Sequence, residues 1–189
     1  MTNFDRWHLY CKDFPSPKSY IDFSFYVLIS AALQRRVWFG SEEMPLFPNQ
    51  YLIFIGPPAV GKGVVVGTIS YFLKYHKFEK GARVQTNEGF EYPLLFPVGA
   101  DSITFEALIE DIALSIRRSI KPDGTSYAYT AYVFCLEELS SLFKHKTEDV
   151  TKFLLNAYDS KSYDYKTRHK GKFLLRKLCL TLIAASTPD

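Results

Sequence analysis

The chain has 189 residues, of which 47% are hydrophobic and 16% aromatic, and its formal net charge is +3. This size and composition predict one globular domain with a packed core. They exclude a bilayer-spanning protein, because the longest apolar run near the start, residues 23–33, is shorter than the roughly 20 residues that a membrane helix needs. The first residues show no cationic leader, so nothing in them points to export. The three cysteines are widely spaced and lack the spacing of metal ligands, which argues against structural zinc. We therefore expect a cytoplasmic protein without a membrane partner.

The first 48 residues predict an N-terminal arm and a helix. Residues 1–18 contain Pro15 and Pro17 and show little periodicity, so we expect an irregular arm. A helix over about residues 18–38 follows, and Pro45 and Pro48 mark a turn. Residues 49–189 then form the predicted core of the domain.

Helices and strands alternate through this core. We expect strands at residues 51–55, 94–98, 127–136 and 178–185. We expect helices at residues 62–75, at 148–158, and from the cap Thr104 through the apolar position Ile116. A turn is expected at residues 121–126. A short continuous apolar strand such as residues 51–55 is typical of a buried parallel sheet. The pattern predicts an α/β fold with a central, mainly parallel sheet flanked by helices.

A glycine-rich segment follows the first of these strands. The stretch "GPPAVGKG" fits seven of the eight positions of the phosphate-binding loop, G-x-x-x-x-G-K followed by Ser or Thr. Such a loop cradles an anion with backbone N–H groups and a helix N-terminus, while its lysine reaches the β- and γ-phosphates. We therefore predict that ATP is bound by Gly56, Pro57, Pro58, Ala59, Val60, Gly61, Lys62, Gly63 and Val64.

Gly63 occupies the position where a Ser or Thr hydroxyl normally binds Mg²⁺. Without that hydroxyl, Mg²⁺ would be held by the phosphates, water and an acidic partner elsewhere, which predicts a weaker dependence on magnesium. The glycine could instead mark a loop that binds nucleotide and turns it over slowly or not at all. The sequence leaves both interpretations open.

Two later strands end in polar residues that suit this chemistry. The strand at 127–136 runs into Glu137, a candidate magnesium ligand, and Glu138, a candidate general base for the attacking water. The last strand ends at Ser186 and Thr187, and we expect Thr187 to contact the γ-phosphate or the water. Taken alone, each pattern is also compatible with a strand that ends in solvated acids or with an ordinary Ser-Thr-Pro turn.

With these motifs, the chain resembles the ATPase core of phage- and plasmid-encoded primase-helicases, which are related to superfamily 3 helicases of the AAA+ class of P-loop NTPases. The resemblance spans about residues 20–189 and rests on "RRVW" at 35–38, the loop at 56–63, "SITFEAL" at 102–108, Glu137-Glu138, "YKTRHKG" at 165–171 and "TPD" at 187–189. It implies an ATP-driven motor on DNA that assembles as a hexameric ring and replicates a mobile element in a bacterial host cytoplasm. The family continues beyond the third motif with a strand, an arginine finger and a helical lid, so we expect a fragment or a core that lacks the lid.

The segment 161–177 carries seven Lys or Arg residues against one Asp. Alternation followed by "HKG" predicts a hairpin, which in related motors grips nucleic acid inside the ring. We expect Lys166, Arg168, Lys170 and Lys172 to contact phosphates of single-stranded DNA and the hairpin tyrosines to stack on bases. A solvated surface hairpin, or an arginine finger formed by Arg168 or Arg176, remains an alternative.

A replicative helicase motor is the function we expect from these features. A DNA-packaging or DNA-loading ATPase is the second enzymatic interpretation. A nucleotide-gated assembly module, in which ATP holds subunits together with negligible hydrolysis, is the rival from another class.

Overall fold

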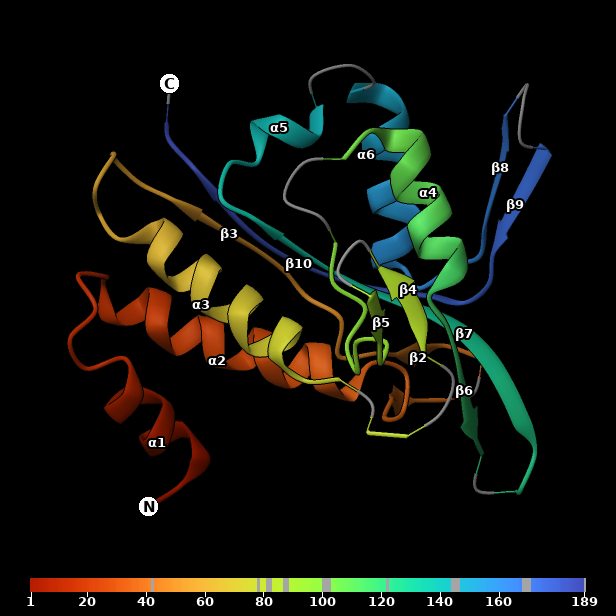
Figure 1. Ribbon diagram of the computed structural model, residues 1–189, viewed down its shortest axis with the longest axis horizontal. Helices are drawn as coiled ribbons and strands as arrows, with labels where there is room; N and C mark the ends of the chain where they lie inside the picture. The colour runs from red at the N-terminus through yellow and green to blue at the C-terminus, as the bar shows by residue number, and fades with distance from the viewer. Residues whose placement is uncertain are drawn as a thin grey trace.

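The computed structural model describes residues 1–41, 43–77, 79–80, 83–86, 89–99, 103–121, 123–143, 147–167 and 171–188. Its described residues form three layers, with a central four-stranded sheet between two groups of helices (Figure 1). The predicted α/β class is confirmed.

The central sheet has the strand order β3–β10–β7–β6, with β3 at Tyr51–Ile55, β10 at Leu178–Ser186, β7 at Ser126–Leu136 and β6 at Ile116–Ile120. Both β3 and β7 run parallel to β10, whereas β6 pairs antiparallel with β7. The sheet is therefore mixed, and the expectation of a mainly parallel sheet is corrected. The physical reason is the turn at residues 121–126, because a connection this short can join only antiparallel strands.

The carboxyl-terminal half of β7 has a further neighbour on the side away from β10. Val98 forms a parallel bridge with Val133. The Gly99 amide donates to the Val133 carbonyl at 2.9 Å, and the Val133 amide donates to Pro97 at 2.8 Å. The strand expected at 94–98 is thus reduced to this bridge and to an antiparallel bridge between Lys77 and Leu94.

Alternating side chains of the sheet strands supply both apolar cores. Tyr132, Phe134 and Leu136 of β7 face α4 (Phe105–Leu114) and α6 (Thr147–Tyr158), whereas Val133 and Cys135 face α2 (Lys18–Leu33) and α3 (Lys62–Tyr75). Figure 1 shows α2 and α3 on one side of the sheet and α4, the short α5 (Ser140–Phe143) and α6 on the other. The core on the α2 and α3 side contains residues from both parts of the chain separated by the predicted boundary at residue 48.

The N-terminal segment is more regular than its sequence suggests. Residues 3–10 form helix α1 (Asn3–Tyr10), so the expectation of an irregular arm is wrong there. Thr2 caps the helix and exchanges hydrogen bonds with Asp5 in a capping box. Trp7 is buried, and its indole N–H donates to the Ile21 carbonyl at 3.0 Å, which fixes α1 on α2.

Two predicted helix ends also differ from the structure. Helix α2 stops at Leu33 instead of near residue 38, because Gln34 takes a positive φ of 54° that ends the helix. Helix α4 begins after the cap Thr104 as expected, but it ends before Ile116. There the amide and hydroxyl of Ser115 both donate to the Ile112 carbonyl and close the last turn.

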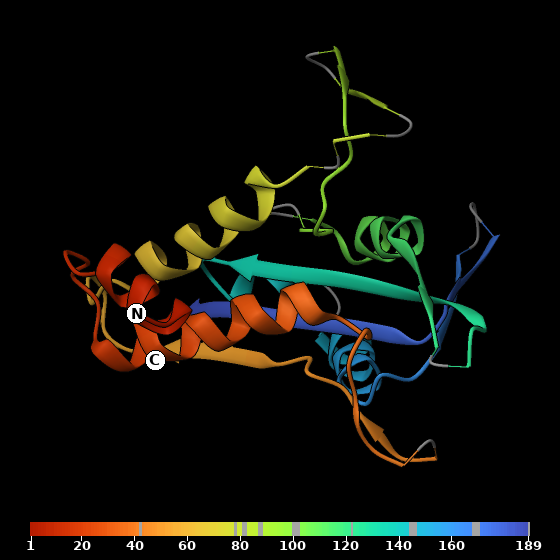
Figure 2. The ribbon, with the colours of Figure 1, turned by 90° about the horizontal axis from the view of Figure 1, so that it is seen from below.

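Three antiparallel ribbons lie outside the central sheet. They are β1 (Phe39–Gly40) with β2 (Pro45–Leu46), β4 (Val84–Thr86) with β5 (Gly89–Glu91), and β8 (Tyr163–Thr167) with β9 (Gly171–Leu175). The last pair confirms the hairpin predicted in the basic segment, and Figure 2 shows the β4–β5 ribbon standing away from the sheet. In the described part of the chain, no helix combines the length and apolarity required to cross a bilayer.

Candidate functional site

The connection between β3 and α3 is a tight turn that contains two residues with left-handed φ angles. Gly61 caps α3 with a left-handed φ of +84°, and Ala59 also has a positive φ, of 64°. A Cβ atom on Gly61 would lie 2.4 Å from the Pro15 carbonyl oxygen, so no other residue fits at this position without moving the backbone. The loop conformation therefore depends on glycine at the position that the motif specifies.

The Lys62 side chain curls back over this loop. The residue is 8% exposed, and its ammonium group donates to the carbonyl oxygens of Gly56 and of Pro57, the latter at 2.8 Å. Backbone carbonyls carry only partial negative charge, so they are weaker partners for an ammonium group than phosphate oxygens are. The contacts hold the predicted phosphate-binding charge against the loop.

The first turn of α2 and the residues just before it support the loop from outside. Ser16 donates from its hydroxyl to the Gly61 carbonyl at 2.8 Å, and Tyr20 donates to the Ile55 carbonyl at 2.8 Å while its ring stacks on Phe54. No local sequence pattern indicates these contacts, because each joins residues at least 34 positions apart.

A cavity of about 390 Å³ opens at the loop. It is lined by Pro15, by residues 58–64 and by Thr187. The predicted nucleotide-binding residues therefore lie together, with Gly56 and Pro57 joined to the same site through Lys62. Thr187 reaches the cavity because β10 lies beside β3, and the Gly56 amide donates to the Ser186 carbonyl at 3.3 Å.

The two predicted carboxylates lie farther along the same edge of the sheet. Glu137 and Glu138 follow β7 and are exposed, with β10 between them and the loop strand. Two strand spacings separate β7 from β3 by about 10 Å. Among the residues that the structure describes, neither glutamate lines the loop cavity.

Glu137 approaches the loop helix from the side. Its Oε1 lies 3.6 Å from the point that a Cβ on Gly67 would occupy, so the carboxylate is beside α3, one turn beyond Gly63. In the described ranges no three His, Cys, Asp or Glu side chains gather as a metal site. The donor set thus fits a magnesium ion that takes one protein carboxylate and completes its shell with phosphate and water oxygens.

Open space surrounds the position of the missing hydroxyl. Apart from the adjoining residues and the backbone of the same helix, no atom of the described residues lies within 4 Å of a Cβ built on Gly63. Gly63 also borders a second open hollow, together with Tyr10, Gly67 and Tyr71. Glycine at this position is therefore not required by packing, and a serine would fit there.

Of the two predicted DNA-contacting cations that the structure describes in the β8–β9 hairpin, one is paired with an acid. Lys166 and Lys172 are exposed and directly opposite each other across the two strands, and Lys172 forms an ion pair with Asp164. Arg168 and Lys170 lie outside the described residues, as do Ser102 and Asp189 of the resemblance motifs. Positively charged contacts to DNA from this hairpin remain a prediction.

The hairpin tyrosines face the interior of the protein. The ring of Tyr163 packs edge-on against Phe153, and that of Tyr165 against Phe105, each at a centroid distance of 5.3 Å. Both side chains cover the core between α4 and α6. The structure gives no support to the expectation that these two rings stack on bases.

A scan against protein-family models found no match for this chain, and a search of curated proteins found none either.

Proposed function

We propose that this protein is a P-loop ATPase that binds Mg²⁺ and ATP at the loop after β3 and uses hydrolysis to move on DNA. One observation carries the proposal. The glycine-rich loop, Thr187 and the Glu137-Glu138 pair come from segments far apart in the sequence, yet they follow the parallel strands β3, β10 and β7 at one edge of the sheet. Ligands of open α/β sheets bind outside the carboxyl ends of such strands.

The strand order supports a motor ATPase over a simple phosphate-binding turn. In ring-forming ATPases a third strand beside the loop strand and the acidic strand presents a polar side chain to the γ-phosphate or the water. Here β10, which ends at Thr187, lies between β3 and β7. The parallel bridge between Val98 and Val133 extends the parallel arrangement beyond β7.

Each residue then has a distinct role. The loop amides and the start of α3 would bind the phosphate groups, and Lys62 would exchange its two carbonyl acceptors for phosphate oxygens. Magnesium held by Glu137 and the phosphates would neutralise charge on the transferred group. Glu138 would orient and deprotonate the attacking water, and Thr187 would bind the γ-phosphate or that water.

Work on DNA is the part of the proposal that rests on the resemblance and on the exposed Lys166 and Lys172 of the β8–β9 hairpin. Several copies arranged in a ring would bring these hairpins to a common channel. Lysines there would bind the strand through its phosphates, without reading its sequence.

A nucleotide-gated assembly module is the second candidate, and Gly63 favours it. The hydroxyl that normally binds magnesium is missing although there is room for it, and the two glutamates lie outside the loop cavity. In such a module ATP binding would stabilise contacts between subunits, and turnover would be negligible.

Steady-state ATP hydrolysis, measured with and without single-stranded DNA, separates the two candidates. The motor predicts turnover that DNA stimulates, and Glu138→Gln should abolish this turnover while ATP still binds. Glu43→Gln, at an exposed glutamate away from the loop, is the matched control and should retain the wild-type rate.

An unchanged rate in Glu138→Gln would exclude Glu138 as the base. Tight ATP binding without turnover would favour the assembly module. In that case Gly63→Ser tests whether restoring the hydroxyl restores hydrolysis, because the added side chain meets no steric obstacle.

A further inference from the structure

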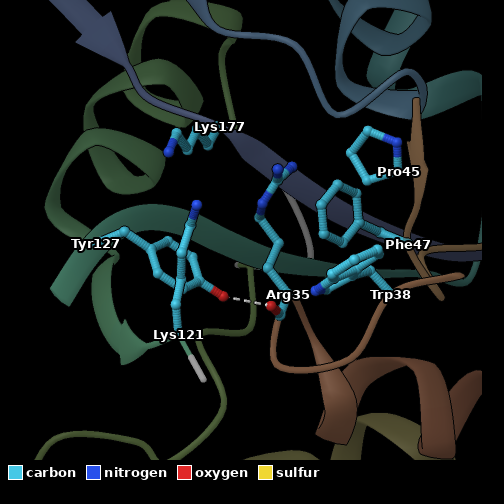
Figure 3. Close-up of a pocket in the computed structure, with 7 residues that line it drawn as sticks. All are labelled: Arg35, Trp38, Pro45, Phe47, Lys121, Tyr127 and Lys177. Carbon is cyan, nitrogen blue, oxygen red and sulfur yellow. Dashed lines mark hydrogen bonds between the residues drawn. The ribbon is translucent and has the colours of Figure 1, made fainter. Parts of the chain in front are cut away.

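A second cavity lies at the opposite edge of the sheet from the phosphate-binding loop. It has a volume of about 260 Å³ and forms where the chain leaves α2 and where β7 and β10 begin. Three cations line it, Arg35, Lys121 and Lys177, together with three aromatic side chains, Trp38, Phe47 and Tyr127 (Figure 3). We call this set the basic aromatic pocket. It shares no residue with the loop cavity.

Arg35 is the most informative member of this pocket. It is only 7% exposed, and its Nη1 donates to the carbonyl oxygens of Ser160 at 3.1 Å and Leu178 at 3.2 Å. Its Nε is buried without a hydrogen-bond partner in the described part of the chain. A buried guanidinium is normally paired with a carboxylate, and here the described residues supply only neutral acceptors.

The environment of Arg35 disfavours its charge. Burial lowers the pKa of the guanidinium from its ordinary value, and the polar neighbours that oppose this shift are Cys179 and two tyrosines. Phe47 lies flat against the charge, with the guanidinium carbon 3.5 Å from the ring centroid. A bound anion would therefore offset a desolvation cost that these neutral neighbours compensate only in part.

Lys121 and Lys177 add two exposed cations at the mouth of the pocket. In the described residues neither forms an ion pair with a carboxylate, and Lys177 lies 5.4 Å from the centre of the Tyr127 ring. The nearest acid on the β6–β7 turn, Asp123, accepts hydrogen bonds from Thr125 instead. Within the described ranges, the three charged groups that line the pocket are all positive.

The aromatic side chains give the pocket a second property, a surface for a flat ring. Trp38 is 46% exposed although it is a large hydrophobic side chain. Tyr127 is held in place by a hydrogen bond of 2.6 Å from its hydroxyl to the Arg35 carbonyl, the dashed line in Figure 3. Figure 3 shows the guanidinium of Arg35 between Lys177 and the ring of Phe47, so charge and aromatic surface lie side by side.

We propose that the basic aromatic pocket binds one unpaired nucleotide, with its base against the exposed face of Trp38 and its phosphate at Arg35, Lys121 and Lys177. Stacking on an aromatic ring next to phosphate-binding cations is how proteins bind single-stranded nucleic acid without reading sequence. A duplex would not satisfy both parts, because its bases are paired and stacked on one another. The site goes beyond the proposed ATPase and stands without it.

The size of the pocket argues for a single nucleotide unit. Pockets that enclose whole small molecules usually measure about 300–1,000 Å³, and this one is slightly smaller. It suits one unit of a longer strand whose neighbouring units lie outside, or a free mononucleotide. The two sources share the same chemistry and are distinguished by the experiment.

The test is fluorescence anisotropy of a labelled oligothymidylate of about ten nucleotides, measured without ATP on the full chain over a range of salt concentrations. Lys121→Ala/Lys177→Ala should weaken binding at least tenfold and lower the salt slope by about 1 to 2. Trp38→Ala should weaken binding about tenfold or more with little change in that slope, because stacking releases no counterions. Arg35 is left intact, because its burial makes it a structural risk.

Two double variants serve as controls. Lys12→Ala/Lys18→Ala removes the same charge from exposed positions remote from the pocket and should bind like the wild type. Lys166→Ala/Lys172→Ala reports on the β8–β9 hairpin alone. If only this second variant weakens binding, the pocket assignment is overturned.

Competition with thymidine monophosphate identifies the source of the nucleotide. Displacement only at far higher concentrations than unlabelled strand supports a strand, whereas comparable displacement supports a free nucleotide. Equal displacement by inorganic phosphate would overturn the role of Trp38, and equal binding of a duplex would overturn the whole proposal. ATP binding by each variant is measured separately and should be unchanged. Failure of the pocket proposal would appear in oligothymidylate binding, and failure of the proposed ATPase would appear in ATP binding and turnover, so the two are distinguishable.

Discussion

The two edges of the central sheet carry proposed ligand sites that are built in different ways. At the carboxyl edge, the loop of residues 56–61 is one continuous segment whose shape comes from backbone, with Lys62 folded onto its carbonyls. At the other edge, the basic aromatic pocket is made of side chains from the end of α2, the β2 region, the β6–β7 turn and the start of β10. A site built from contiguous backbone leaves a motif in the sequence, and a site assembled from separate side chains does not.

The edges also differ in their electrostatics. Glu137 lies beside α3, the helix that follows the loop, which suits a magnesium ion between carboxylate and phosphate. Among the described residues, the charged side chains that line the pocket are all cations, and Arg35 is buried among neutral acceptors. We therefore expect nucleotide at the first edge to depend on magnesium and nucleotide at the second edge to be independent of it.

The largest expected effect comes from Lys62→Ala. Loss of the ammonium group should reduce ATP turnover by about 100-fold or more, since removal of a single group that stabilises charge in a transition state costs this much in other enzymes. Binding of oligothymidylate at the basic aromatic pocket should not change. Lys12→Ala is the control for charge, and equal loss of both activities in Lys62→Ala would show that the edges are not independent.

Gly61→Ala should have the next largest effect. The substitution forces a side chain into a left-handed conformation that costs about 1–3 kcal/mol and places it against Pro15. Gly63→Ala, two residues along the same loop, should stabilise the protein by about 0.5 kcal/mol, because its site is open and helical. Urea denaturation of both variants measures the difference, and equal stabilities would mean that the loop shape does not depend on Gly61.

The same contrast explains what the sequence could predict. The strand at 51–55, the helix at 62–75 and the β8–β9 hairpin follow from local periodicity and turn residues, and the structure confirms them. The sequence pattern does not predict β6 as a strand, because the apolar periodicity of the preceding helix continues through Ile116, and the antiparallel pairing of β6 with β7 depends on a contact that periodicity does not report. Support of the loop by Ser16 and the burial of Arg35 depend on contacts across 45 and 143 residues, beyond the reach of any local pattern.

Alkaline pH should destabilise the pocket edge. Burial raises the pKa of Cys179 from 9.0 to about 12 in the folded protein. The contribution of this thiol to stability is therefore fully present below pH 9 and is lost as the pH rises from about 9 toward 12, because only the unfolded chain releases the proton in that range. At pH 10 the expected loss is on the order of 1 kcal/mol. Urea denaturation at pH 8, 9 and 10 measures it, and Cys179→Ala should reduce this loss; an identical pH dependence in the variant would contradict the assignment.

The smallest and most discriminating pair of changes removes one hydroxyl at each edge. Ser16→Ala deletes the donor to the Gly61 carbonyl, and Tyr127→Phe deletes the donor to the Arg35 carbonyl. Each variant should lose about 1 kcal/mol of unfolding free energy, the usual net value of one such hydrogen bond. Because the expected losses of stability are equal, a difference in ligand binding between the two variants would show that each hydroxyl acts on the ligand site next to it. We expect Ser16→Ala to weaken ATP binding severalfold without affecting the binding of oligothymidylate. We expect Tyr127→Phe to weaken the binding of oligothymidylate without affecting that of ATP. The opposite pattern, or an equal loss of both ligands in both variants, would mean that the two edges communicate through the sheet, which would itself be the coupling that a motor requires.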